Sequence, residues 1–179
     1  MRAVDIDEKY RPSSIWNYDT RSLEALDAYQ AAVLSNPTAV PSLLGLTLQE
    51  VDQALSDTRR ELDDQVTMAL IASYEAVFRT DFWAWVSRTR KGGLRSKFRA
   101  LEQQYGDKVP LEEILEKWAS ATGKTEAVGR MAQLVKYRHW LAHGRYWTQK
   151  SGIRPTPEQA WDTGTIVFAV LPGLEDALR

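Results

Sequence analysis

The sequence contains no cysteine among its 179 residues. A disulfide framework, a cysteine-ligated zinc or iron–sulfur centre and a thiol nucleophile are therefore excluded. Long apolar runs are also missing. Residues 1–10 are charged and lack the hydrophobic segment of a signal peptide, and no apolar run reaches the about 20 residues that cross a bilayer. We therefore expect a cytoplasmic protein that does not enter a membrane.

Acidic residues are absent from two long segments, although the formal net charge of the chain is only −1. Residues 88–99 and 127–150 contain bases and no acid, and a local positive field favours an anionic ligand more than net charge does. The bases are Arg88, Arg90, Lys91, Arg95, Lys97 and Arg99 in the first segment, and Arg130, Lys136, Arg138, Arg145 and Lys150 in the second. A solvated helix face explains the first segment equally well. The second segment also holds both histidines of the chain, which favours a functional site there.

Helical periodicity and capping signals predict an all-α fold, an antiparallel bundle of about five helices with a less certain C-terminal arm. The length suits a single domain, which we place at 19–179 after an irregular segment at 1–18. The expected helices are 19–34, starting at Asp19 or Thr20, then 47–87, 94–105, 110–119 and 125–143. Residues 47–87 either form one helix or restart at Phe82. A short helix begins near Thr156, and residues 165–171 fit either a strand or a buried helix.

An aromatic cluster lies near the end of the longest expected helix. It comprises Phe78, Phe82, Trp83 and Trp85, with Val86 beside them. Packing in the core or at a dimer interface is the simpler interpretation of such a cluster. Base stacking is the alternative.

The two histidines, His139 and His143, stand four residues apart on one expected helix, a spacing at which two imidazoles can share a metal. The zinc-peptidase pattern requires a glutamate where this chain has Trp140, and the neighbourhood is basic. We therefore expect neither a metal nor a cofactor. A purely structural alternative remains: a histidine can complement the dipole at a helix C-terminus, and Arg138 can pair with an acid on another helix.

Residues 134–144, Leu-Val-Lys-Tyr-Arg-His-Trp-Leu-Ala-His-Gly, resemble the signature of HEPN domains. In that family of helical bundles, an arginine is followed by four to six residues and a histidine, often with Asn, Asp or His directly after the arginine. Arg138 and His143 take the two motif positions, and His139 takes the third. The resemblance is specific over about ten residues and rests elsewhere on the helical layout. It implies RNA cleavage by two-fold dimers whose facing motifs form one cleft.

The residue types suit that chemistry. Cleavage of RNA without a metal needs a base for the 2′-hydroxyl proton, an acid for the leaving 5′-oxygen and positive charge beside the phosphate. Histidine suits the proton transfers, and the planar arginine fork suits the phosphate. On an ideal helix Arg138 and His143 lie about 140° apart and do not share a face. One chain therefore supplies half of a site, and we hypothesise that one His143 of a homodimer is the base and the other the acid.

Flanking residues fit a single-stranded RNA ligand. Lys136, Arg145 and Lys150 are expected to hold the RNA backbone, while Tyr146 and Trp147 are expected to stack on bases. For Trp140, packing against the helix bundle is the favoured interpretation over stacking. In some toxins of the family, a tyrosine two residues after the motif histidine is adenylylated; Tyr146 stands three residues after His143.

The sequence thus predicts a metal-independent endoribonuclease that leaves 2′,3′-cyclic phosphate and 5′-hydroxyl ends. A role as a toxin or phage-defence effector follows from the resemblance, with RNA and, for a toxin, a cognate antitoxin as partners. Two alternatives stay open. One is a non-catalytic HEPN module that binds RNA or a nucleotide, and the other is a structural helical dimerisation protein.

Overall fold

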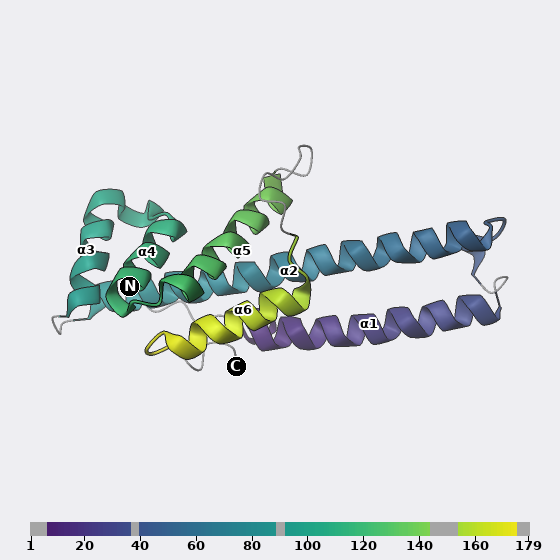
Figure 1. Cartoon of the computed structure of the whole chain (residues 1–179), viewed down its shortest axis with the longest axis horizontal. Coiled ribbons are helices and arrows are strands. Elements are labelled where there is room, and N and C mark those ends of the chain that lie inside the picture. The colour runs from purple at the N-terminus through teal and green to yellow at the C-terminus, as the bar shows by residue number, and fades with distance from the viewer. Residues whose placement is uncertain (1–6, 37–39, 89–91, 144–153, 175–179) are drawn as a thin grey trace.

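A computed structural model describes residues 7–36, 40–88, 92–143 and 154–174, and Figure 1 shows their arrangement. The described parts of the chain are helical and contain no strand, which confirms the all-α prediction. They form six α-helices, and short 3-10 turns lie at Glu8–Tyr10, Pro41–Leu43 and Gly106–Lys108. The α-helices are α1 (Pro12–Ser35), α2 (Leu48–Ser87), α3 (Gly93–Tyr105), α4 (Leu111–Thr122), α5 (Thr125–His143) and α6 (Pro157–Val170). None of these helices is long and apolar enough to cross a membrane.

The 40-residue helix α2 is the central element, and every other α-helix packs against it. A capping box starts it: the Thr47 hydroxyl accepts a hydrogen bond from the Glu50 amide, and the Glu50 carboxylate accepts one from the Thr47 amide at 2.8 Å. The helix then continues unbroken to Ser87, so the alternative restart at Phe82 does not occur.

Helix α1 begins earlier than the sequence analysis predicted, because residues 12–18 are helical and not irregular. Pro12 occupies the first turn, where its fixed φ and missing N–H suit a helix start. Trp16 stacks on Trp161 of α6 with ring centroids 5.2 Å apart. This contact is distant in sequence, so local periodicity did not reveal it. Asp19, expected as a cap, is instead buried within the helix.

Helix α6 settles the ambiguous C-terminal region as helix. A second capping box, formed by Thr156 and Gln159, starts it. Phe168 is fully buried and packs against Tyr74 and Phe78 of α2 at centroid distances of 5.5 and 5.4 Å. The expected C-terminal arm is therefore part of the core, and the short helix predicted near Thr156 is α6, which packs against α1, α2 and α5.

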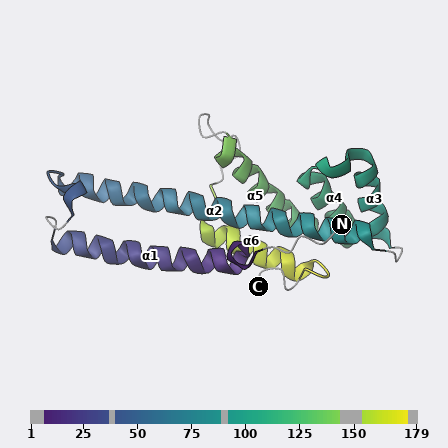
Figure 2. The ribbon, with the colours of Figure 1, turned by 180° about the vertical axis from the view of Figure 1, so that it is seen from behind.

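The main core surrounds the C-terminal two-thirds of α2 and includes side chains from α3 to α6. Phe78, Phe82 and Val86 are buried in it, as the packing interpretation predicted, while Trp83 and Trp85 are half-buried against it. A separate small cluster joins the end of α1 to the start of α2 through Val33, Val51 and Leu55. Figures 1 and 2 show the end of α1 and the start of α2 extending away from the rest of the molecule.

Candidate functional site

The motif lies on the last turns of α5, whose observed bounds agree with the predicted helix 125–143. This helix packs against α2, α4 and α6 and crosses α2 obliquely in Figure 1. Tyr137 and Leu141 are buried, whereas Lys136 and His139 are exposed and Arg138 is half-buried. The motif helix therefore presents Lys136 and His139 at the surface and holds Arg138 at the boundary with α2.

Arg138 forms an ion pair with Glu75 of α2, with 3.2 Å between Nη1 and Oε2. The other oxygen of Glu75, Oε1, accepts from Nε of Arg79 at 2.9 Å and lies 2.9 Å from its Nη2. Pairing of Arg138 with an acid on another helix was the structural alternative of the sequence analysis, and this contact is present. Two guanidiniums share one carboxylate, however, so the cluster keeps a net charge of +1.

The Arg138 guanidinium is incompletely satisfied by this contact. Its Nε is buried and has no hydrogen-bond partner among the residues that the structure describes. A buried donor without an acceptor costs about 1–3 kcal/mol. The side chain nevertheless remains 35% exposed. Arg138 is therefore anchored on Glu75 and still reaches the solvent, where an anion can approach it.

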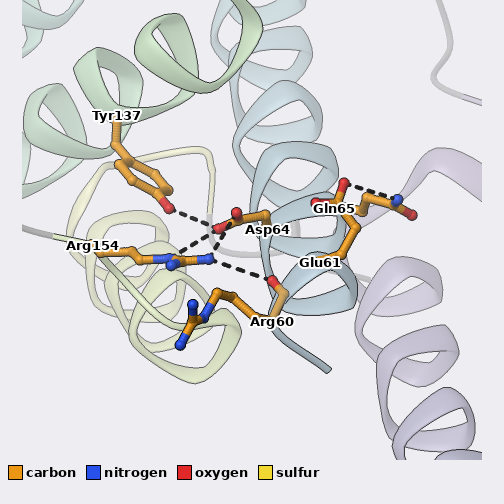
Figure 3. Close-up of polar contacts among 6 residues, drawn as sticks. All are labelled: Arg60, Glu61, Asp64, Gln65, Tyr137 and Arg154. Carbon is orange, nitrogen blue, oxygen red and sulfur yellow. Dashed lines mark hydrogen bonds and ion pairs between the residues drawn. The ribbon is translucent and has the colours of Figure 1, made fainter. Parts of the chain in front are cut away.

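Tyr137, the residue before Arg138, contacts a different part of α2. Its hydroxyl donates a 2.9 Å hydrogen bond to Oδ1 of the buried Asp64. Arg154 reaches the same carboxylate from beyond α5, through Nε at 3.2 Å and Nη2 at 2.8 Å (Figure 3). Burial, together with the hydrogen bond to Asp64, raises the pKa of Tyr137 to about 12. Tyr137 and Arg154, which lie on either side of residues 144–153 in the sequence, thus both bind Asp64.

Two consecutive residues of α5, Tyr137 and Arg138, therefore contact two carboxylates of α2. Asp64 and Glu75 are eleven residues apart, which places them about 16 Å apart along the axis and nearly on one face of an ideal helix. The sequence analysis allowed for an acid beside Arg138 but identified neither Glu75 nor Asp64 as a partner. The available signals were an acid within the buried stripe of α2 for Asp64 and the four-residue spacing to Arg79 for Glu75.

The remaining predicted site residues divide between described and undescribed parts of the chain. Trp140 is half-buried and stacks on Tyr137 with centroids 5.6 Å apart, in agreement with the packing interpretation. His143 is the last residue of α5, and its side chain lies outside the described residues. So do four predicted RNA-binding residues, namely Arg145, Tyr146, Trp147 and Lys150.

The first basic segment lies apart from the motif. Arg88 covers the ring of Trp85 at 3.9 Å, and Lys97 donates to the Ser120 hydroxyl at 2.6 Å. Arg90 and Lys91 are outside the described residues. Helix α3, which carries the rest of the segment, packs on α2 and α4 and lies far from the motif end of α5 in Figures 1 and 2. The described residues therefore form two separate basic regions.

Comparison with known proteins assigns no family. No protein-family model matches the chain, and no curated protein or solved structure is significantly similar to it. The function is therefore inferred from the motif and its surroundings.

Proposed function

We propose that this chain is a metal-independent endoribonuclease of the HEPN type that leaves 2′,3′-cyclic phosphate and 5′-hydroxyl ends. The observation that carries the proposal is the net positive cluster of Arg138, Glu75 and Arg79 at the motif. A cluster that served only to neutralise Arg138 would need no second arginine on the same carboxylate. Here the surplus charge lies at a half-exposed guanidinium, which suits a phosphodiester.

The proposed roles follow from the chemistry of each side chain. Arg138 stabilises the negative charge that develops on the phosphate in the transition state. His143 takes the 2′-hydroxyl proton, and His143 of a second copy donates a proton to the 5′-oxygen. The ideal-helix separation of about 140° between positions 138 and 143 supports a dimer in which a second copy completes the site; the bundle itself is proposed to be antiparallel.

Neighbouring side chains extend the proposed site along the RNA. Lys136 and His139 are exposed on α5. Beyond its second residue, Glu126, this helix carries no acid, so the side chains that α5 itself offers to an RNA strand toward its C-terminus are neutral or positive. Arg145 and Lys150 are proposed to continue the backbone contacts, and Tyr146 and Trp147 to stack on bases.

The test compares purified wild-type protein with Arg138→Ala and His143→Ala on a labelled single-stranded RNA in EDTA. Arg130→Ala is the matched control, because Arg130 is an exposed arginine on the same helix that pairs with the exposed Glu126. We expect cleavage by wild type and by the control, and loss of at least about 100-fold in both motif variants. Equal cleavage by all four proteins would refute the assignment of the site.

A non-catalytic RNA-binding module is the second candidate, and the anchoring of Arg138 on Glu75 favours it, since a static contact is sufficient for binding. The same experiment separates the two functions. If wild type binds RNA tightly without cleaving it and Arg138→Ala binds it weakly, the chain is this binding module and not a nuclease. If neither cleavage nor binding depended on the motif, a structural dimerisation protein would remain.

A toxin or phage-defence role is part of the proposal and has its own test. Induced expression in a bacterial host should arrest growth, and His143→Ala should relieve the arrest while accumulating to the same level. Growth arrest by both proteins would separate toxicity from the motif. A cognate antitoxin would be identified as a gene product whose co-expression restores growth in cells that express the wild-type protein.

A further inference from the structure

Glu75 is held from two sides inside the helix bundle. Its side chain is 19% exposed, and both of its oxygens face an arginine: Oε1 faces Arg79, and Oε2 faces Arg138. Charge-assisted contacts of this kind are short and directional. The position of this carboxylate is therefore determined by more than its own helix.

Arg79 is the fixed member of this cluster. While Nε and Nη2 face Glu75, Nη1 donates a 3.0 Å hydrogen bond to the main-chain oxygen of Val109. Val109 is buried just before α4 begins. Arg79 thus connects the Glu75 carboxylate to a main-chain atom outside α2. This contact restricts the movement of the Glu75 side chain.

Arg138 differs from Arg79 in how it is held. Among the described residues, its guanidinium contacts Glu75 through Nη1, and its buried Nε has no hydrogen-bond partner there. An arginine side chain is long and flexible, so the direction of its guanidinium depends on the contacts that restrain it. For Arg138, the carboxylate of Glu75 is that restraint.

We infer that Glu75, supported by Arg79, is a positioning residue that sets the orientation of the Arg138 guanidinium toward the scissile phosphate. The inference rests on the proposed function for its catalytic consequence. Glu75 does not touch the substrate in this account; it acts through Arg138. It also lowers the local charge, so removing it makes the site more positive while leaving Arg138 less ordered.

Those two effects act on different kinetic constants. Disorder of a catalytic group reduces the rate of the chemical step, and a misplacement of about 1 Å can cost on the order of 100-fold. Added positive charge strengthens or preserves the binding of the anionic ground state. We therefore expect Glu75→Gln to lower kcat by about 10- to 100-fold while KM stays equal or falls. A loss of stability alone would not produce this split.

Glu75→Gln suits the test because glutamine keeps the size of the side chain and retains one carbonyl oxygen. Because Arg79 and Arg138 contact different oxygens of Glu75, one of them would face the amide NH2 of glutamine, which donates hydrogen bonds and does not accept them. Glu126→Gln is the matched control, since Glu126 forms an exposed pair with Arg130 on the motif helix itself. Arg79→Ala is the second variant: it leaves the carboxylate in place but removes its support, so a smaller loss of kcat is expected. Circular dichroism and thermal unfolding establish that each variant is folded.

A second readout does not depend on cleavage. The Nε of Arg138 is buried, so its proton should exchange slowly enough to be observed by NMR. The heteronuclear NOE of the Arg138 Nε–Hε group, assigned by its loss in Arg138→Ala, measures the order of the side chain. We expect a high value in wild type and Glu126→Gln, and a clearly lower value in Glu75→Gln.

The outcomes separate the inference from the proposed function. Unchanged kcat in Glu75→Gln, together with lost cleavage in Arg138→Ala, would overturn the positioning role and leave the nuclease in place. Failure of wild type to cleave any RNA would remove the nuclease, and the NOE would then decide the positioning role alone. An equally ordered Arg138 in wild type and Glu75→Gln would overturn the inference in either case.

Discussion

Gly164 of α6 allows this helix to lie directly against Tyr74 of α2. A Cβ atom at this position would lie 2.5 Å from Cζ and 2.6 Å from the hydroxyl oxygen of Tyr74 on α2. The Tyr74 ring has no room to retreat. It is fully buried, its edge meets Phe168, and its hydroxyl donates to the main-chain oxygen of Ala160.

The expected cost of Gly164→Ala follows from two opposing terms. Overpacking a rigid core contact costs about 1–3 kcal/mol, and the short distances place this site near the upper value. Replacing glycine by alanine within a helix returns about 1 kcal/mol. We therefore expect the free energy of unfolding to fall by about 2 kcal/mol.

Gly129 provides the matched control, because it is exposed within α5 and a Cβ there meets nothing within 4 Å. Gly129→Ala should raise the free energy of unfolding by about 0.5–1 kcal/mol through helix propensity alone. Urea unfolding followed by circular dichroism measures both changes. Shifts of the same sign in the two variants would refute the packing of α6 against Tyr74 described here.

Three further predictions concern polar groups. Tyr137→Phe removes the hydrogen bond to the buried Asp64 and should lower the free energy of unfolding by about 1 kcal/mol in urea titrations, and no change would contradict the contact. Thr47→Ala removes the capping box and should cost about 1 kcal/mol, whereas Thr47→Asp should restore most of it. Burial raises the pKa of Asp19 to about 6, above the value near 4 of an unfolded chain, so stability falls as pH rises between about 4 and 6. The stability gained by Asp19→Asn should therefore grow across that range in urea titrations and level off above it; a gain independent of pH would contradict the raised pKa.

Helix boundaries that depend on local signals were predicted well from the sequence. The start of α2 at the Thr47 capping box and the end of α3 before Gly106, whose φ is 60°, agree with the predicted ranges 47–87 and 94–105. Gly123, in the left-handed conformation with φ 71°, ends α4 in the same manner, at Thr122 and not at the predicted position 119. These features are decided by residues within one turn of each other, and such residues are adjacent in the sequence.

Features that depend on distant residues were missed or left open. Helix α1 begins at Pro12 partly because Trp16 packs on Trp161, and this partner is 145 positions away. The helical state of 165–171 likewise depends on the place of Phe168 against α2. Periodicity within a short window carries no information about such partners, which is why a stretch rich in β-branched residues also fitted a strand.

The candidate site shows the same division. Arg138 and His143 are recognisable from their spacing alone, and the end of α5 at His143 follows from the glycine after it. The acid that orients Arg138 was not recognisable, because Glu75 and Arg138 are brought together by the crossing of α2 and α5. The motif therefore points to the candidate residues, while the residues that contact them are determined by the fold.

The central claim is that RNA is cleaved by attack of its own 2′-hydroxyl at a site containing Arg138 and His143. The most direct measurement uses one RNA oligonucleotide in EDTA, first with ribose at the cleaved nucleotide and then with 2′-deoxyribose at that nucleotide alone. The account predicts a 2′,3′-cyclic phosphate product from the first and no cleavage at that position in the second. Cleavage next to the deoxyribose would contradict it, because no internal nucleophile is present there.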